Sequence, residues 1–106
     1  MMKHYLVYVT VSRAEEAETI GKLVLSEKLA ACVNISGKTR SLFEWDGKLE
    51  STSENIMFIK TNEKKLQLLL KRIDELHSYD CPSIVALELS DGKQEFFDWV
   101  DRALDY

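Results

Sequence analysis

The sequence predicts an α+β fold in which strands and helices follow each other in the order β-α-β-β-α-β-α. Two observations predict the outer elements: short runs with apolar residues at every second position, and longer runs with apolar residues at helical spacing. A third observation predicts the centre, where residues 32–61 have the pattern of one long β-hairpin. The chain has 106 residues, and we expect a single domain covering residues 1–106.

The first strand is predicted at residues 3–11, where apolar side chains occupy both faces, as in a central strand covered on two sides. The first helix follows directly. Ser12 and Glu15 have the spacing of a capping box, in which each side chain accepts a hydrogen bond from the backbone N–H of the other residue. Apolar residues at helical spacing then predict that this helix continues to about residue 28.

The predicted hairpin turns at Asp46-Gly47, a pair that suits a type I′ turn because both central residues need a positive φ. Each arm has about fourteen residues, whereas strands usually have about five or six. A bulge or bend is expected at Ser36-Gly37, because a glycine inside a strand pattern often marks one. The hairpin therefore extends beyond the domain, and its outer part carries apolar side chains: Leu42, Phe43, Trp45 and Leu49.

The second half of the chain repeats the strand-helix-strand order. Asn62 is the predicted N-cap of a helix over residues 63–77, which has leucines and isoleucine on one side and lysines on the other. Pro82 disfavours helix in the residue before it, so a loop precedes the fourth strand at residues 84–89. A turn then leads into a last helix containing apolar residues between positions 96 and 104.

Two β-α-β units joined in this order give a ferredoxin-like sandwich, with both main helices on one face of an antiparallel sheet. The C-terminal helix is an addition to that plan. The opposite face of the sheet has little within the chain to cover it. We therefore expect the protein to associate with copies of itself.

Composition and charge limit the classes of partner. The chain has 14 Lys and Arg against 18 Asp and Glu, a formal net charge of −4, which does not favour nucleic-acid binding. No apolar run approaches the ~20 residues that a membrane span needs. The first residues lack the pattern of a signal peptide, so we expect a cytoplasmic protein with no membrane partner.

Few residues carry the chemistry of a metal site or an active site. His77 and Cys81 lie close in sequence, and Cys32 adds a second thiol; imidazole and thiolate suit copper and zinc. The spacing alone favours another interpretation, in which His77 ends its helix and the cysteines are small packed side chains. Glu54 and Lys60 lie six residues apart, so they face the same side of a strand and either share a pocket or form a surface ion pair, the second being favoured.

Enzymatic motifs are absent: the sequence has no glycine-rich phosphate loop and no GxSxG motif. We therefore expect a protein that is not an enzyme and that has no organic cofactor. Three other classes share the predicted topology. A metallochaperone needs a CxxC after the first strand, an acylphosphatase needs a glycine-rich anion loop there, and an RNA-recognition domain needs a basic face with exposed aromatic residues. The sequence has neither the CxxC nor the glycine-rich loop, and although Tyr8 and Phe58 are possible aromatic platforms, the net charge argues against RNA binding.

Four segments together resemble the CutA family, the divalent-cation tolerance proteins. The resemblance implies a ferredoxin-like fold, an architecture similar to the PII signalling proteins, and a tight homotrimer built by strand pairing between subunits. It also implies a link to tolerance of copper and other divalent metals. The segments are E-K-L-A-A-C-V-N (27–34), S-L-F-E-W-D-G-K-L (41–49), F-I-K-T (58–61) and H-S-Y-D-C-P (77–82).

Residues carried over from the family differ in part. Val9 stands where bacterial members implicated in copper binding have a cysteine, and Leu76 stands where they have the first of two adjacent histidines. The remaining candidates for a metal ligand are His77 and Cys32, the latter in a matching A-A-C-V motif. We accordingly expect at most weak binding of Cu²⁺ or another divalent cation.

The resulting prediction is a trimeric, cytosolic binding or signalling protein, with Phe43, Trp45 and Leu49 in the contact between subunits. The cleft between subunits would contain three polar candidates, Glu54, Lys60 and Tyr79. The alternative is a small-molecule hydrolase or transferase that acts in the same cleft.

Overall fold

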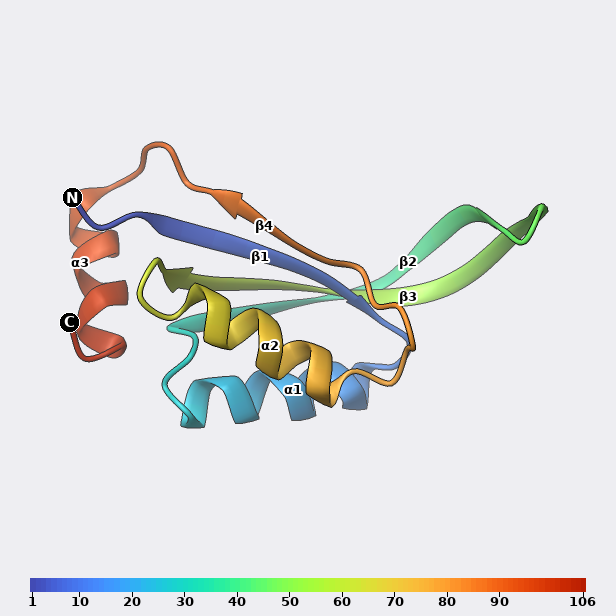
Figure 1. Ribbon diagram of the computed structural model, residues 1–106, viewed down its shortest axis with the longest axis horizontal. Helices are drawn as coiled ribbons and strands as arrows, with labels where there is room; N and C mark the ends of the chain where they lie inside the picture. Colours follow the sequence, from blue (N-terminus) through green and yellow to red (C-terminus); the bar gives the residue numbers. More distant parts are fainter.

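The computed structural model describes residues 1–106 and contains one four-stranded sheet and three helices (Figure 1). The α+β class and the predicted element order are confirmed. The elements are β1 (His4–Val11), α1 (Ala14–Ser26), β2 (Cys32–Trp45), β3 (Lys48–Asn62), α2 (Leu66–Leu76), β4 (Ile84–Glu88) and α3 (Gln94–Ala103).

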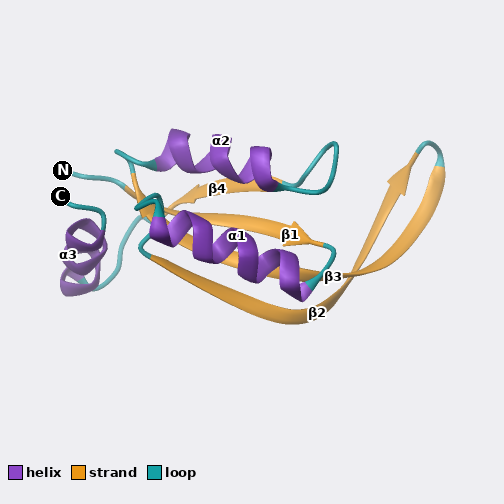
Figure 2. Ribbon diagram, turned by 90° about the horizontal axis from the view of Figure 1, so that it is seen from below, coloured by secondary structure: helices purple, strands orange, loops and turns teal.

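The strand order in the sheet is β2-β3-β1-β4, and all neighbouring strands are antiparallel. The connection from β1 to β2 passes over β3, and the connection from β3 to β4 passes over β1. Each of these connections contains a helix, and α1 and α2 cover the same face of the sheet (Figures 1 and 2). No helix covers the opposite face.

The core lies between the sheet and these two helices. Val7, Val9 and Val11 of β1 are fully buried, because alternate residues of a strand point to the same face. Met57 and Ile59 of β3 continue this layer without any exposed surface. The helices contribute their own apolar stripes at helical spacing, and the buried members are Ala17, Ile20 and Val24 of α1 and Leu66, Leu69 and Ile73 of α2.

The hairpin of β2 and β3 extends well past the rest of the molecule (Figure 1). Its arms have 14 and 15 residues, and the whole chain measures 45 Å along its longest axis. Asp46 and Gly47 at the tip have φ of 50° and 77°, which confirms the predicted turn with two positive φ angles. The β2–β3 register shifts between Ser36 and Thr39, which confirms the predicted bulge.

The start of α1 differs from the prediction. Arg13, not Ser12, is the N-cap residue, and its side chain makes no capping hydrogen bond. The Ser12 hydroxyl instead donates to Glu16 at 3.2 Å, so the predicted capping box with Glu15 is not formed. The helix also ends at Ser26, two residues early, because the chain turns through Lys28 at a φ of 59°.

Asn62 caps backbone N–H groups as predicted, but it does so in the turn before α2 and not at the first residue of the helix. Its side-chain oxygen accepts the backbone N–H groups of Lys64 and Lys65 at 3.1 and 3.3 Å. The regular helix begins only at Leu66. The side chain therefore satisfies backbone donors in the turn that leads from β3 into α2.

The third helix lies at the end of the sheet that also holds both chain termini (Figure 1). Val100 and Leu104 are its buried anchors. Trp99 is 43% exposed and its ring stacks against Phe96, so this tryptophan is a surface residue of the single chain. The uncovered sheet face likewise carries exposed apolar residues, with Val85 and Leu87 of β4 each about half exposed.

Candidate binding cavity at the base of the hairpin

The candidate site forms where β3 leaves the sheet and meets the loop between α2 and β4. Glu54 of β3 pairs with Thr39, the first residue of β2 beyond the bulge. Tyr79 lies in the loop, two residues after the end-cap residue of α2. The Tyr79 hydroxyl donates a hydrogen bond of 2.8 Å to Glu54 Oε2. The structure thus brings together two of the three polar residues that were predicted for the cleft.

A cavity of about 370 Å³ opens beside this pair. Phe43 and Trp45 pair with Glu50 and Lys48, and directly paired residues of antiparallel strands point to the same side, which is also the side of Glu54. Tyr8 of β1 completes the aromatic lining. Leu42 adds an apolar side chain, and small polar or thiol groups form the rest of the wall: Thr10, Ser41, Cys81 and Ser83.

The environment of Tyr79 keeps its hydroxyl protonated. Burial raises the pKa of Tyr79, and the hydrogen bond and negative charge of Glu54 raise it further, to about 12. The phenol therefore acts as a hydrogen-bond donor to Glu54 throughout the neutral range. A neighbouring hollow of about 450 Å³ shares part of its lining with the cavity, namely Phe43, Trp45, Tyr79 and Cys81.

The loop that carries Tyr79 is held by Glu16 of α1. Glu16 accepts hydrogen bonds from the backbone N–H of Ser78 at 2.9 Å and from its hydroxyl at 3.0 Å. Burial alone would raise the pKa of Glu16, but the hydrogen bonds from Ser78 outweigh it and the pKa is lowered. Sequence spacing did not reveal this contact, because the two residues are 62 positions apart.

His77 is a structural residue in this loop. Its Nε2 lies 2.7 Å from the carbonyl oxygen of Thr10, which can only accept, so Nε2 carries the proton. Its Nδ1 accepts the backbone N–H of Tyr79 at 3.1 Å. The side chain has no exposed surface. Neither ring nitrogen therefore has a lone pair free for a metal ion.

Cys32 does not lie near His77. It pairs with Lys60 of β3, whereas Thr10, the partner of the His77 ring, pairs with Ile56. Four residues of strand separate these positions, or about 13 Å. Within one chain, His77 and Cys32 therefore do not form a shared metal site, and metal binding by either residue stays a prediction. No cluster of three or more His, Cys, Asp or Glu side chains is arranged to hold a metal ion, and both cysteines are free thiols.

Lys60 also lies apart from the cavity. Its ammonium group donates a hydrogen bond to the Asn34 side chain near the C-terminal end of β3, whereas Glu54 lies in the middle of that strand. Six residues of strand separate the two, about 20 Å, which is too far for an ion pair or a common pocket. The structure corrects both interpretations of Glu54 and Lys60, because an even spacing fixes the face of a strand but not the distance along it.

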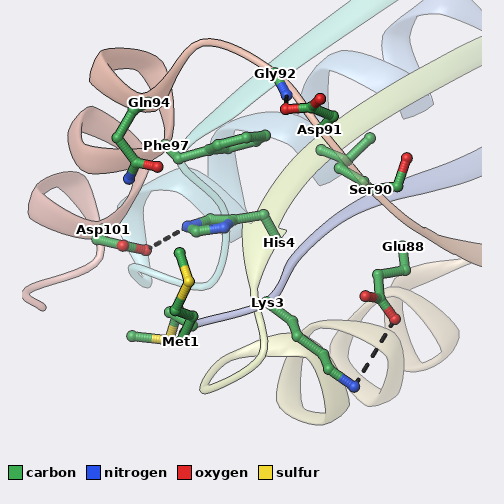
Figure 3. Close-up of a pocket in the computed structure, with 12 residues that line it drawn as sticks. Met1, Lys3, His4, Glu88, Ser90, Asp91, Gly92, Gln94, Phe97 and Asp101 are labelled. Atoms are coloured by element: carbon green, nitrogen blue, oxygen red, sulfur yellow. Dashed lines mark hydrogen bonds and ion pairs between the residues drawn. The ribbon is translucent and has the colours of Figure 1, made fainter.

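A second cavity, of about 470 Å³, lies between the start of β1 and α3 (Figure 3). His4 is its central residue: Nε2 lies 2.9 Å from Asp101 Oδ1, and the ring stacks on Phe97. The Asn62 side chain donates to the same Asp101 oxygen at 3.0 Å. These contacts fasten α3 to β1 and β3. We interpret these contacts as structural. No sequence pattern indicated them, because they link residues far apart in the chain.

Comparison with known proteins identifies the family. A family model described as "CutA1 divalent ion tolerance protein" matches residues 5–103, nearly the whole chain. The chain belongs to this family. The resemblance that the four sequence segments indicated is thereby confirmed.

Individual CutA proteins match over their full length. The divalent-cation tolerance protein CutA of Archaeoglobus fulgidus is 40% identical over 102 residues, covering 96% of this chain and 99% of that protein. The crystal structure of the divalent ion tolerance protein CutA1 from Ehrlichia chaffeensis superposes with a TM-score of 0.93 at 28% identity, covering 98% of this chain and 97% of the other. The α+β fold with a four-stranded antiparallel sheet and three helices is therefore that of CutA1 structures.

The compartments of the relatives differ. A CutA protein of Arabidopsis thaliana, 38% identical over 98 residues, is described as chloroplastic, and this chain spans 54% of its length. The structure from Archaeoglobus fulgidus is described as that of a periplasmic protein. In the present chain, none of the helices combines the length and the apolar character that crossing a membrane requires.

Proposed function

We propose that this chain is a ferredoxin-like subunit of a PII-like homotrimer, which works in the cytoplasm as a binding or signalling protein and catalyses no reaction. The observation that carries the proposal is the outer hairpin. Trp45 is 58% exposed and Leu49 is 80% exposed, and Leu42 and Phe43 are exposed beside them. A single chain that leaves so much apolar surface in water is incomplete.

Assembly would bury the apolar side chains of the outer hairpin and so remove the unfavourable free energy of their exposure to water. Burying one such side chain contributes roughly 1.5–3 kcal/mol, and a threefold arrangement repeats the gain at every contact. A head-to-tail contact that closes into a ring also avoids open filaments. Phe43, Trp45 and Leu49 are the side chains that we assign to this contact. The uncovered face of the sheet, with Val85 and Leu87 exposed, supports the same proposal.

The cavity at the base of the hairpin supports a binding role. Its volume of about 370 Å³ falls in the range of small-molecule sites, and it lies next to the side chains that a neighbouring subunit would cover. The alternative of a hydrolase or transferase finds no such support. The imidazole that packs against Tyr79 belongs to His77, and both its nitrogens are engaged.

The name of the family concerns tolerance of divalent cations. The residues that were predicted to hold such a cation do not fit it, since His77 is enclosed and Cys32 lies apart. Cys81, a free and exposed thiol, is the soft ligand that remains accessible. We therefore keep the prediction that Cu²⁺ or another divalent cation binds weakly, and we derive no step of the function through it.

Light scattering on the purified protein tests the assembly. One chain has a mass of 12.2 kDa, so the proposal expects a particle of three times that mass. The particle should keep this mass on dilution to low micromolar concentration, as a permanent assembly does. A particle with the mass of one chain would contradict the proposal.

A further inference from the structure

Glu54 is an enclosed carboxylate with too few partners. Its exposed fraction is 7%, yet the Tyr79 hydroxyl is the one hydrogen-bond donor that reaches it within the chain. No lysine, arginine or histidine forms an ion pair with it. A carboxylate has two oxygens with about four acceptor positions, and taking it out of water is unfavourable unless a positive charge or several donors compensate. No fully buried side-chain oxygen of the chain lacks a hydrogen-bond partner, so the Glu54 oxygen that Tyr79 does not reach is open to the cavity, where a donor from outside the chain can bind it.

The surroundings of Glu54 determine the kind of partner. The cavity beside it is lined by the rings of Tyr8, Phe43, Trp45 and Tyr79. The face of an aromatic ring attracts a cation, most strongly where water is excluded. Aromatic faces do not ligate a hydrated divalent metal, and a carboxylate repels an anion. A carboxylate enclosed by aromatic rings thus fits an organic cation.

We propose that this cavity binds a small organic cation with N–H donors, an alkylammonium or an alkylguanidinium. An N–H group of the ligand donates to Glu54, whose other contact is the Tyr79 hydroxyl. The positive charge lies against the aromatic rings, and the alkyl part packs beside the other apolar lining of the cavity. No covalent step takes place.

This inference deepens the proposed function and rests on it, because a neighbouring subunit that covers the outer hairpin would also close the mouth of the cavity. A lysine or arginine of that neighbour has the same chemistry as the free ligand. The two sources differ in one respect: a neighbour's side chain would already occupy the cavity in the assembled protein and would exclude an added amine.

Calorimetric titration with n-butylammonium at pH 7 and low salt tests the proposal. We expect saturable binding of n-butylammonium, and no binding of 1-butanol, which has a similar shape without the charge. Tetramethylammonium, a cation without N–H donors, should bind more weakly than n-butylammonium. Equal heats for the amine and the alcohol would overturn the proposal.

The variant Glu54→Gln removes the charge and nearly preserves the shape of the side chain. It should weaken n-butylammonium binding about tenfold or more, the effect of losing a hydrogen bond to a charged group. Glu44→Gln is the matched control, because Glu44 is exposed on the opposite side of the same hairpin, and its binding should equal that of the unmodified chain. If Glu54→Gln does not fold, the comparison of amine with alcohol on the unmodified chain still decides the question.

Light scattering on the same samples separates the two proposals. A trimer that binds n-butylammonium through Glu54 supports both. A trimer that takes up no amine overturns the cation site and leaves the assembly standing. If that trimer also dissociates in Glu54→Gln, the cation is a side chain of the neighbouring subunit, and the proposal of a small ligand is wrong. A monomer that binds the amine would overturn the assembly alone.

Discussion

The Tyr79 hydroxyl donates a hydrogen bond of 2.8 Å to the Glu54 carboxylate, although the two residues are 25 positions apart in the sequence. Tyr79 belongs to the loop after α2, and Glu54 belongs to the strand that continues into the outer hairpin. The bond therefore fixes the hairpin base against the body of the domain. It also gives the cavity its shape, because both residues line it.

The titration of Tyr79 should identify this bond. Its pKa in the folded chain is raised above the usual 10 to about 12, so the stability that the proton contributes is complete below pH 10 and is lost as the pH rises toward 12. Ultraviolet absorbance of the phenolate should show a late titration step near pH 12. Tyr79→Phe should remove that late step. Tyr106→Phe, at an exposed position, should leave it in place, and a late step that survives Tyr79→Phe would contradict the assignment.

Glu16 should stabilise the chain in a manner that depends on pH. Because the pKa of Glu16 is lowered in the folded state, its contribution is present above its ordinary value of 4.5 and is lost as the pH falls below it. Glu16→Gln should lower the free energy of unfolding by roughly 1.5 kcal/mol at pH 7, and the difference should shrink in acid. Urea denaturation at pH 7 and pH 3.5 measures both values.

Glu15→Gln is the control for that series, since Glu15 is an exposed neighbour whose only partner is Arg13. Surface ion pairs contribute little, so this variant should match the unmodified chain at both pH values. An equal loss in both variants would show that the contacts of Glu16 with Ser78 are not responsible.

Local chemistry in the sequence predicted much of the fold. The Asp46-Gly47 turn, the bulge after Ser36 and the capping role of Asn62 each depend on residues within a few positions of one another, and all three are found. The start of α1 was predicted incorrectly, because its side chains make contacts with a loop that is distant in the sequence. Ser12 donates to Glu16 instead of taking part in a capping box with Glu15, and Glu16 also accepts two hydrogen bonds from Ser78 of a distant loop.

The candidate site was only half visible in the sequence. The period of a strand placed Glu54 and Lys60 on one face, but the period says nothing about the 20 Å between them. The sequence did not predict that Tyr8 lines the cavity, because Tyr8 reaches the site only through the pairing of β1 with β3. The sequence favoured His77 as the end of its helix over a metal ligand, and only the contacts with the carbonyl of Thr10 and the N–H of Tyr79 show that both ring nitrogens are engaged.

The hairpin tip should be sensitive to the loss of its glycine. Gly47 has a φ of 77°, so Gly47→Ala forces a side chain into the left-handed region and should cost about 1 kcal/mol. Gly37→Ala is the control, because nothing lies within 4 Å of the added methyl group and its φ is not positive. Thermal melts followed by circular dichroism compare the two. Equal melting temperatures would mean that the turn does not contribute to stability.

Copper binding should not depend on His77. Because both ring nitrogens are engaged, His77→Gln should leave the heats of a Cu²⁺ titration unchanged at a temperature where the variant is folded. Cys81→Ser, which removes the exposed thiol, should reduce any weak binding that the unmodified chain shows. A titration in which His77→Gln abolishes copper uptake would show that the loop opens and exposes the imidazole.

The last prediction concerns the contact between subunits. Trp45→Asp would place a charge without a partner in an apolar contact, a change that costs several kcal/mol and is repeated at each of the proposed interfaces. The particle should fall from the mass of three chains to that of one, or the protein should become insoluble. Leu68→Asp is the matched control: Leu68 is 56% exposed on α2, away from the hairpin, so this variant should keep the mass of the unmodified protein. If Trp45→Asp stays trimeric with an unchanged melting temperature, the hairpin is not the contact that organises the assembly, and the uncovered face of the sheet becomes the next region to test.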